Sequence, residues 1–176
     1  MKKDIETIYN LHVDDLHTYA LYLGFEKETI MDAIHDVFCK LAGEKEILND
    51  VSNVKFYLFR SLKNRLFDIY KSKREHLNLI AVEPHNSPFN IHVTIEDKLI
   101  DIENQEIIKS QIEEMLNTLT DRQREVVYLR YIQEYDYQQI SDLLNINIHS
   151  CRKLVSKAMT SLREKYGTLL IFLLLS

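Results

Sequence analysis

Apolar positions along this chain return every three or four residues and do not alternate. The spacing holds over residues 4–23, 28–41 and 51–74. It places the apolar side chains on one face of a helix, so each range is predicted to be helical. Gly24 directly follows the first range, and glycine is typical of the residue that ends a helix.

The helical pattern stops between residues 75 and 95. This stretch holds both prolines, Pro84 and Pro88, and shows no sustained period, which is typical of a linker. A helical pattern resumes over 97–116. We therefore predict two small helical domains, residues 1–75 and 101–176, joined by a flexible linker at 76–100.

Two capping patterns mark helix starts in the C-terminal half. Thr120 followed by Gln123, and Asp136 followed by Gln139, have the residue types and spacing of a capping box. They predict helices near 121–132 and 137–144.

The last helix is predicted to begin just after a tight turn. Asn145 tolerates the left-handed conformation that ends a helix, and Asn147 is a good N-cap. Beyond them one apolar stripe follows steps of three and four residues: Ile148, Cys151, Val155, Ala158 and Leu162. A short helix, a short turn and a second helix constitute a helix-turn-helix motif.

Composition supports an all-α fold. The 176 residues include only three Gly and two Pro, and 45% are hydrophobic, which favours long helices and allows a buried core. Cys39 and Cys151 form no CxxC pair, the seven histidines are scattered and no glycine-rich phosphate loop is present. We expect no disulfide framework, no metal, no cofactor, no small-molecule substrate and no enzymatic activity.

The two ends of the chain show no export or membrane signal. The N-terminus, MKKDIETIYN, is polar, so we expect a cytoplasmic protein. The apolar run at 169–175 is much shorter than the roughly 20 residues that span a bilayer. We expect it to pack in the core of the second domain, with contact to a protein partner as the alternative.

The formal net charge of −5 conceals two basic segments. Residues 55–74 carry seven basic and one acidic side chain, and residues 147–176 carry five basic and one acidic. Residues 1–50 and 75–120 are acidic, with five basic against eleven acidic and two against nine. Because one-sided positive charge attracts phosphate, each basic segment is a candidate nucleic-acid surface.

Several motifs together resemble the extracytoplasmic-function (ECF) sigma factors, a class of the sigma-70 family of RNA polymerase sigma factors. Region four of that family is similar to residues 119–164, LTDRQREVVYLRYIQEYDYQQISDLLNINIHSCRKLVSKAMTSLRE. Regions 2.3 and 2.4 are similar to residues 56–74, FYLFRSLKNRLFDIYKSKR, and regions 2.1 to 2.2 to residues 31–41, MDAIHDVFCKL.

The resemblance implies three sets of contact residues. The upstream, minus-35 promoter element is expected to contact His149, Ser150, Arg152, Lys153, Ser156 and Lys157. The downstream, minus-10 element is expected to contact Tyr57, Arg60, Asn64, Arg65, Asp68 and Lys71. Core polymerase is expected to contact Asp32, His35, Asp36 and Phe38.

The implied function is promoter-specific initiation of transcription. The expected partners are promoter DNA, core RNA polymerase through the clamp helices of its largest subunit and its flap, and an anti-sigma factor. The alternative is a dimeric helix-turn-helix regulator that binds operator DNA. The second basic and aromatic segment at 51–74 favours the sigma factor, because a plain repressor has no use for it.

Overall fold

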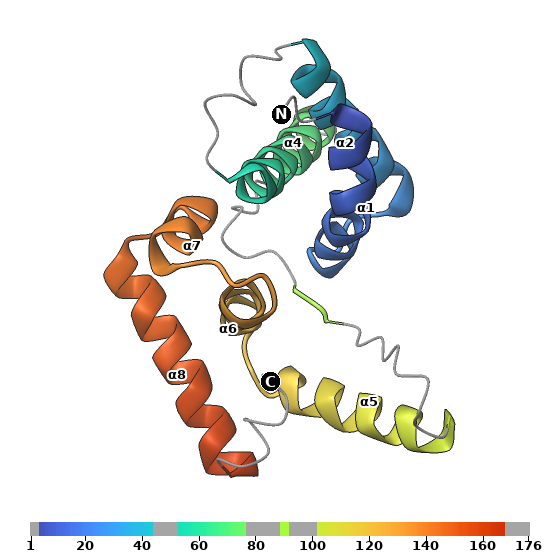
Figure 1. Ribbon diagram of the computed structural model, residues 1–176. Helices are drawn as coiled ribbons and strands as arrows, with labels where there is room; N and C mark the ends of the chain where they lie inside the picture. The colour runs from blue at the N-terminus through green and yellow to red at the C-terminus, as the bar shows by residue number, and fades with distance from the viewer. Residues whose placement is uncertain (1–3, 44–52, 77–88, 92–101, 168–176) are drawn as a thin grey trace. The chain divides into compact units, whose positions relative to one another are not determined.

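The computed structural model describes residues 4–43, 53–76, 89–91 and 102–167, with the helical backbone alone at 73–76 and 102–109. Its regular elements within these ranges are all helices (Figure 1). The chain divides into two compact units, Met1–Ser87 and Pro88–Ser176. The all-α prediction is confirmed.

The described part of unit 1 contains three helices that pack on one another: α1 (Ile5–Tyr22), α2 (Lys27–Gly43) and α4 (Val54–His76) (Figure 1). Its core consists of the apolar stripes that the sequence pattern identified. Fully buried members include Leu16, Tyr19, Ile30, Ile34, Leu41, Phe59, Leu62 and Leu66.

Local signals set the helix ends in unit 1. Gly24 has a φ of 81° and its N–H donates to the carbonyl of Leu21 at 2.9 Å, so the predicted terminator adopts the left-handed conformation that glycine allows. At the start of α4, Asn53 Oδ1 accepts a hydrogen bond from the Phe56 N–H at 2.9 Å. Such a side-chain acceptor satisfies one of the exposed N–H groups of a first helical turn.

Unit 2 contains α5 (Ile102–Asn117), α6 (Asp121–Val127), the π-helical segment η2 (Tyr128–Ile132), α7 (Tyr137–Leu144) and α8 (Ile148–Tyr166). Helix α8 packs on α6 and α7. One buried cluster joins α5, α6 and α8 through Met115, Leu119, Val127, Ala158 and Leu162.

The predicted helix at 121–132 spans the right residues but changes type. Its last five residues form the π-helical segment, and the N–H of Gln133 reaches the carbonyl of Tyr128 at 3.1 Å. Gln133 is buried, and its amide Nε2 donates to the Tyr128 hydroxyl at 2.8 Å. Apolar spacing over a single turn does not distinguish an α-helix from a π-helix, which is why the sequence did not reveal the change.

Phe89, within the predicted linker, packs into unit 2. Phe89 is only 1% exposed, its ring centroid lies 5.6 Å from that of Tyr128, and its N–H donates to Asp121 Oδ1 at 3.2 Å. Most of the rest of the predicted linker, and the apolar run at 169–175, lie outside the described residues.

Candidate nucleic-acid interface

The helix-turn-helix is held by the side chains that the sequence singled out. Thr120 and Asp136 each form a complete capping box, with Gln123 and Gln139 respectively. Asn145 adopts the left-handed conformation, with φ 51° and ψ 48°, and Asn147 accepts a hydrogen bond from the Ser150 N–H at 2.7 Å. The turn prediction is confirmed.

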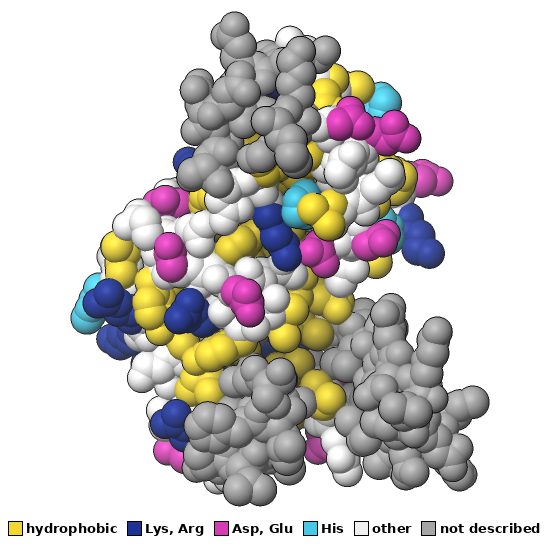
Figure 2. All heavy atoms as spheres, viewed as in Figure 1, with side chains coloured by type: hydrophobic (Ala, Val, Ile, Leu, Met, Phe, Trp, Pro, Cys, Tyr) yellow, Lys and Arg dark blue, Asp and Glu magenta, His cyan; other side chains and the backbone are white. Residues whose placement is uncertain are grey.

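Helix α8 has one buried and one exposed face. Cys151, Val155, Ala158 and Leu162 are buried, as the stripe predicted. The side chains of Arg152, Lys153, Ser156 and Lys157 are exposed, as is that of His149, while Ser150 is half-buried at the first turn. Figure 2 shows Lys and Arg side chains gathered over the first half of α8, with a His beside them. We call Arg152, Lys153, Ser156 and Lys157 the α8 basic face.

The neighbouring elements add two side chains that the sequence interpretation did not single out. The guanidinium carbon of Arg152 lies 5.4 Å from the centroid of the Tyr137 ring, and that of Arg130 lies 5.2 Å from the same ring. Tyr137 opens α7, and Arg130 lies in η2. No sequence pattern predicts this contact, because the three side chains come from three elements that meet only in the folded unit.

Another unexpected contact ties α7 to α6. Arg122 Nη2 donates to the carbonyl of Leu144 at 2.9 Å, and its Nη1 lies 3.2 Å from Glu125 Oε2. Carbonyl groups in the last turn of a helix lack a partner within the helix. By donating to one of them, Arg122 stabilises the turn that leads from α7 into α8.

Burial also governs the cysteine on the inner face of α8. It raises the pKa of the Cys151 thiol, against the smaller lowering effects of Arg130, Arg122 and Arg152.

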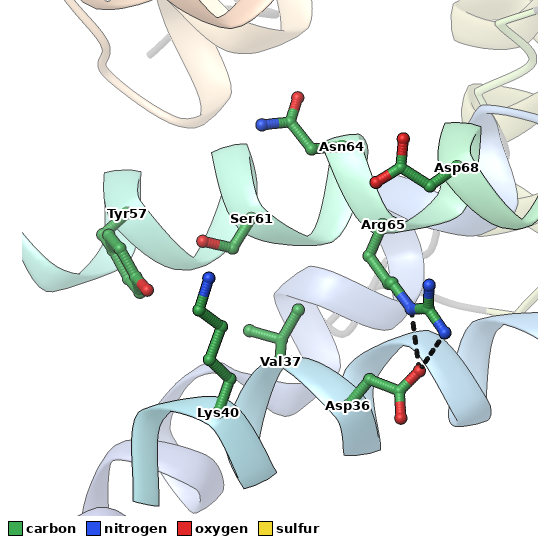
Figure 3. A pocket seen from close by; sticks show the side chains of 8 residues that line it. All are labelled: Asp36, Val37, Lys40, Tyr57, Ser61, Asn64, Arg65 and Asp68. Carbon is green, nitrogen blue, oxygen red and sulfur yellow. Dashed lines mark hydrogen bonds and ion pairs between the residues drawn. The ribbon is translucent and has the colours of Figure 1, made fainter. Parts of the chain in front are cut away.

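In unit 1, four of the six residues predicted to contact the minus-10 element line one pocket between α2 and α4. The pocket has a volume of about 440 Å³. From α4 it is lined by Tyr57, Ser61, Asn64, Arg65 and Asp68, and from α2 by Asp36, Val37 and Lys40 (Figure 3). Lys40 extends from α2 toward Tyr57 and Ser61 (Figure 3). Arg60 and Lys71 are exposed but do not line this pocket.

An ion pair joins the two predicted surfaces of unit 1. Arg65, expected to contact DNA, lies 2.7 Å through Nη2 from Oδ2 of Asp36, expected to contact polymerase. Its Nε donates to the same oxygen at 2.8 Å (Figure 3). The two surfaces therefore meet at the pocket.

Three cationic side chains of α4 are paired or buried, so fewer of them are available to bind DNA than the sequence indicated. Lys55 pairs with Asp15 at 3.0 Å, and Arg65 with Asp36. Lys63 is only 7% exposed, and its Nζ lies 5.9 Å from the Phe67 ring centroid. Among the α4 cations whose side chains the structure describes, Arg60 and Lys71 are the exposed ones without a recorded ion pair.

The aromatic residues of α4 divide between core and surface. Phe59 is fully buried against Tyr19, with ring centroids 5.1 Å apart. Phe56, Tyr57 and Phe67 are half-buried, and Tyr70 is exposed. The expectation that part of this set forms the core is confirmed.

The four residues of α2 that are expected to contact polymerase differ in their exposure to solvent. Asp32 and His35 are exposed, and Asp36 is half-buried beside Arg65. Phe38 is only 7% exposed and packs edge-on against Tyr9, with centroids 5.0 Å apart. Phe38 therefore lies in the core of unit 1 and offers little surface, and its contact with polymerase stays a prediction.

Neither a metal cluster nor a membrane helix occurs within the described ranges. No group of three or more His, Cys, Asp or Glu side chains there is arranged to hold a metal ion. No helix in the same part of the chain is long and apolar enough to cross a bilayer.

Comparison with known proteins finds similarity along nearly the whole chain. Residues 109–162 match the family described as Sigma-70, region 4. Over 173 residues the chain is 26% identical to the ECF RNA polymerase sigma factor SigM of Bacillus subtilis (strain 168), covering 93% of this chain and 95% of SigM.

Two solved structures share the fold. The sigma factor RpoE of Bartonella quintana, in complex with the anti-sigma factor NepR, matches with a TM-score of 0.60 and 19% identity over 92% of this chain and 96% of its own. CnrH, in complex with the cytosolic domain of CnrY, matches with a TM-score of 0.51 and 16% identity over 91% of this chain and 85% of its own.

These matches agree with the geometry. The family match includes the complete helix-turn-helix, and the likeness to SigM continues through the pocket-forming helices of unit 1. Residues 109–162 therefore carry a sigma-70 region 4 domain, and the chain is similar over nearly its whole length to an extracytoplasmic-function sigma factor.

Proposed function

We propose that this chain directs core RNA polymerase to specific promoters, with unit 2 binding the minus-35 element and unit 1 binding the minus-10 element. The observation that carries the proposal is the exposed basic face of α8, set on a capped helix-turn-helix in a chain similar to SigM over 93% of its length.

In unit 2, α8 has the properties of a recognition helix. Its apolar stripe holds it to the domain, while the α8 basic face projects into solvent. Arginine and lysine side chains reach guanine edges and phosphates in the major groove. His149 and Ser150, at the first turn of α8, would lie near the phosphate backbone.

In unit 1, the pocket between α2 and α4 suits an unpaired strand. The half-buried Tyr57 ring offers a stacking platform, and Lys40 supplies positive charge beside it. Asn64 and Asp68 offer hydrogen-bonding groups to base edges, while Arg60 and Lys71 extend the basic surface outside the pocket. We propose that binding energy, without nucleotide hydrolysis by this chain, keeps the strand open.

The exposed acidic side of α2 would contact core polymerase. Asp32 and His35 are open to solvent, and Asp36 lies at the rim of the pocket. We propose that this surface meets the clamp helices of the largest subunit, and that unit 2 meets the flap. The chain would carry no catalytic activity and need no cofactor, metal or small-molecule substrate.

An anti-sigma factor is the proposed regulator. RpoE and CnrH, which share this fold, were solved in complexes with NepR and CnrY. A partner that covers the α8 basic face or the pocket would block DNA binding. Promoter DNA and RNA polymerase are both found in the bacterial cytoplasm, so we propose that this chain is cytoplasmic. The dimeric-regulator alternative is not favoured, because SigM is similar along both units.

Reconstitution tests the proposal. The purified chain is mixed with bacterial core polymerase, and association is followed by gel filtration at low salt. Initiation is then measured by run-off transcription on templates selected from a randomised promoter library. We expect stable association and sequence-dependent transcripts. No association, or transcripts without sequence preference, would contradict the proposal.

Matched variants locate the surfaces in the same assay. Lys157→Ala should weaken use of the selected promoters, whereas Lys165→Ala removes an equal charge near the other end of α8 and should have little effect. Asp32→Ala should weaken association with core polymerase more than Asp14→Ala, which removes an exposed carboxylate from α1.

A further inference from the structure

Three side chains from three elements of unit 2 meet beside the α8 basic face. The ring of Tyr137, at the start of α7, lies within 5.2 Å of the Arg130 guanidinium carbon and 5.4 Å of the Arg152 guanidinium carbon. Both distances are within the roughly 6 Å over which a guanidinium group is attracted to an aromatic ring. Arg152 is one of the residues assigned above to the minus-35 element.

The ring and Arg130 are held independently of Arg152. Tyr137 directly follows Asp136, whose capping box fixes the local backbone: the Asp136 N–H donates to Gln139 Oε1 at 3.0 Å, and the Gln139 N–H donates to Asp136 Oδ1 at 2.8 Å. Arg130 Nη1 donates to the carbonyl of Tyr135 at 2.9 Å. The ring therefore offers Arg152 a platform that is already in place.

Arg152 keeps its hydrogen-bond donors available. Its side chain is exposed, and within the described part of the chain the structure records no hydrogen bond or ion pair for its guanidinium group. A guanidinium group stacked on a ring keeps the N–H donors at its edge, and that fork matches the O6 and N7 acceptors of guanine. The contact restricts the side chain without occupying its donors.

Lys153 and Lys157 are different. Both are exposed on the same helix, and the structure records no ring contact for either within the described residues. Lysine also lacks the planar fork of arginine. Lys153 is therefore a matched internal control, being one residue along and without an aromatic support.

We propose that Tyr137 is a positioning residue that orients Arg152 toward a guanine-containing base pair of the upstream element, with Arg130 stabilising the same ring. This inference rests on the proposed function of the α8 basic face. If Tyr137 has this role, its substitution changes how strongly the chain prefers one base pair over another. A residue needed only for folding would not have that effect.

The test measures discrimination, using holoenzyme made with the full chain. Equilibrium binding is measured to duplexes that carry the selected upstream element and to duplexes with each base pair substituted in turn. The base pair whose substitution no longer matters in Arg152→Ala is the one that Arg152 reads. At that base pair, Tyr137→Leu should reduce discrimination by about two- to five-fold, and Tyr137→Phe, which keeps the ring, should retain it.

The double variant separates positioning from general damage. Tyr137→Leu should cause no further loss of discrimination in the Arg152→Ala background, because the residue that it positions is gone. Its effect should be undiminished in the Lys153→Ala background. The melting temperature of each variant shows whether unit 2 is folded, and NMR relaxation of the Arg152 Nε–H in the free chain should show greater mobility in Tyr137→Leu.

The outcomes distinguish this inference from the function on which it rests. If Arg152→Ala changes discrimination at no base pair, the assignment of Arg152 to the upstream element is wrong. If Arg152→Ala does so but Tyr137→Leu leaves discrimination and Arg152 mobility unchanged, the positioning role of Tyr137 is wrong. An equal loss at every base pair in Tyr137→Leu would also overturn it.

Discussion

Arg65 of α4 donates through two nitrogens to one carboxylate oxygen of Asp36 on α2, with Nε at 2.8 Å and Nη2 at 2.7 Å. The side chains are 46% and 44% exposed. An ion pair this open to water contributes at most about 1 kcal/mol to stability. Its greater effect is on charge, because Asp36 neutralises a cation on the surface proposed to hold the unpaired DNA strand.

Removing this carboxylate should strengthen binding to single-stranded DNA. Asp36→Asn leaves Arg65 without its counter-charge, so we expect affinity for a single-stranded oligonucleotide to rise by up to about five-fold. Fluorescence anisotropy at low salt measures it. Asp32→Asn makes the same charge change one turn away and should have a smaller effect. An equal gain in the Arg65→Ala background would contradict the role of Arg65.

Cations on the two proposed DNA surfaces should differ in what they control. Lys153→Ala, on the α8 basic face, should change sequence preference within the upstream element. Lys71→Ala, on α4, should lower affinity about equally for all promoters and reduce the slope of log affinity against log salt by about 1. Binding of holoenzyme to a promoter panel at several salt concentrations measures both. Identical profiles for the two variants would show that base and phosphate contacts have been assigned wrongly.

The two cysteines should react at very different rates. Cys39 is exposed on α2 and lies 3.3 Å from His35 Nε2, whereas Cys151 is buried on the inner face of α8. Burial raises the pKa of the Cys151 thiol, so both access and thiolate fraction are low there. At neutral pH a disulfide reagent should modify one thiol quickly, and the second only after unfolding. Cys39→Ser should abolish the fast phase, and its persistence would contradict the burial of Cys151.

Acid should weaken unit 1 through His12. Burial lowers the pKa of His12 below its ordinary value of 6.5, with Lys55 adding to the shift and Asp15 opposing it. The unfolded chain then takes up a proton at His12 more readily than the folded chain does. The part of the folding stability that depends on a neutral His12 is therefore fully present above about pH 6.5 and is lost as pH falls toward the folded pKa. Melting temperatures between pH 8 and pH 5 should fall less steeply for His12→Gln than for the parent chain. Parallel curves would rule out the effect.

Features encoded locally could be predicted from the sequence. The capping boxes at Thr120 and Asp136, the left-handed Asn145 and the buried stripe of α8 each depend on residues a few positions apart. Their geometry follows from backbone hydrogen-bonding needs that do not require tertiary contacts.

Features that depend on packing between elements could not be predicted. Asp36 and Arg65 are 29 positions apart, and neither the burial of Lys63 nor the stacking of Arg152 on Tyr137 follows from a helical period. Charge counts over a segment also overstate its free charge, because they ignore partners such as Asp15 of α1, which pairs with Lys55.

The central claim is that separate basic surfaces of one chain hold upstream duplex and downstream open strand at the same promoter. Footprinting of holoenzyme on one selected promoter, with permanganate detecting unpaired thymines, tests it most directly. We predict protection of the upstream element together with permanganate reactivity at the downstream element. Combined Arg152→Ala and Lys157→Ala should remove the upstream protection, and combined Tyr57→Ala and Lys71→Ala should remove the downstream reactivity while upstream protection persists. Upstream protection and downstream opening that survive both pairs of substitutions would contradict the account.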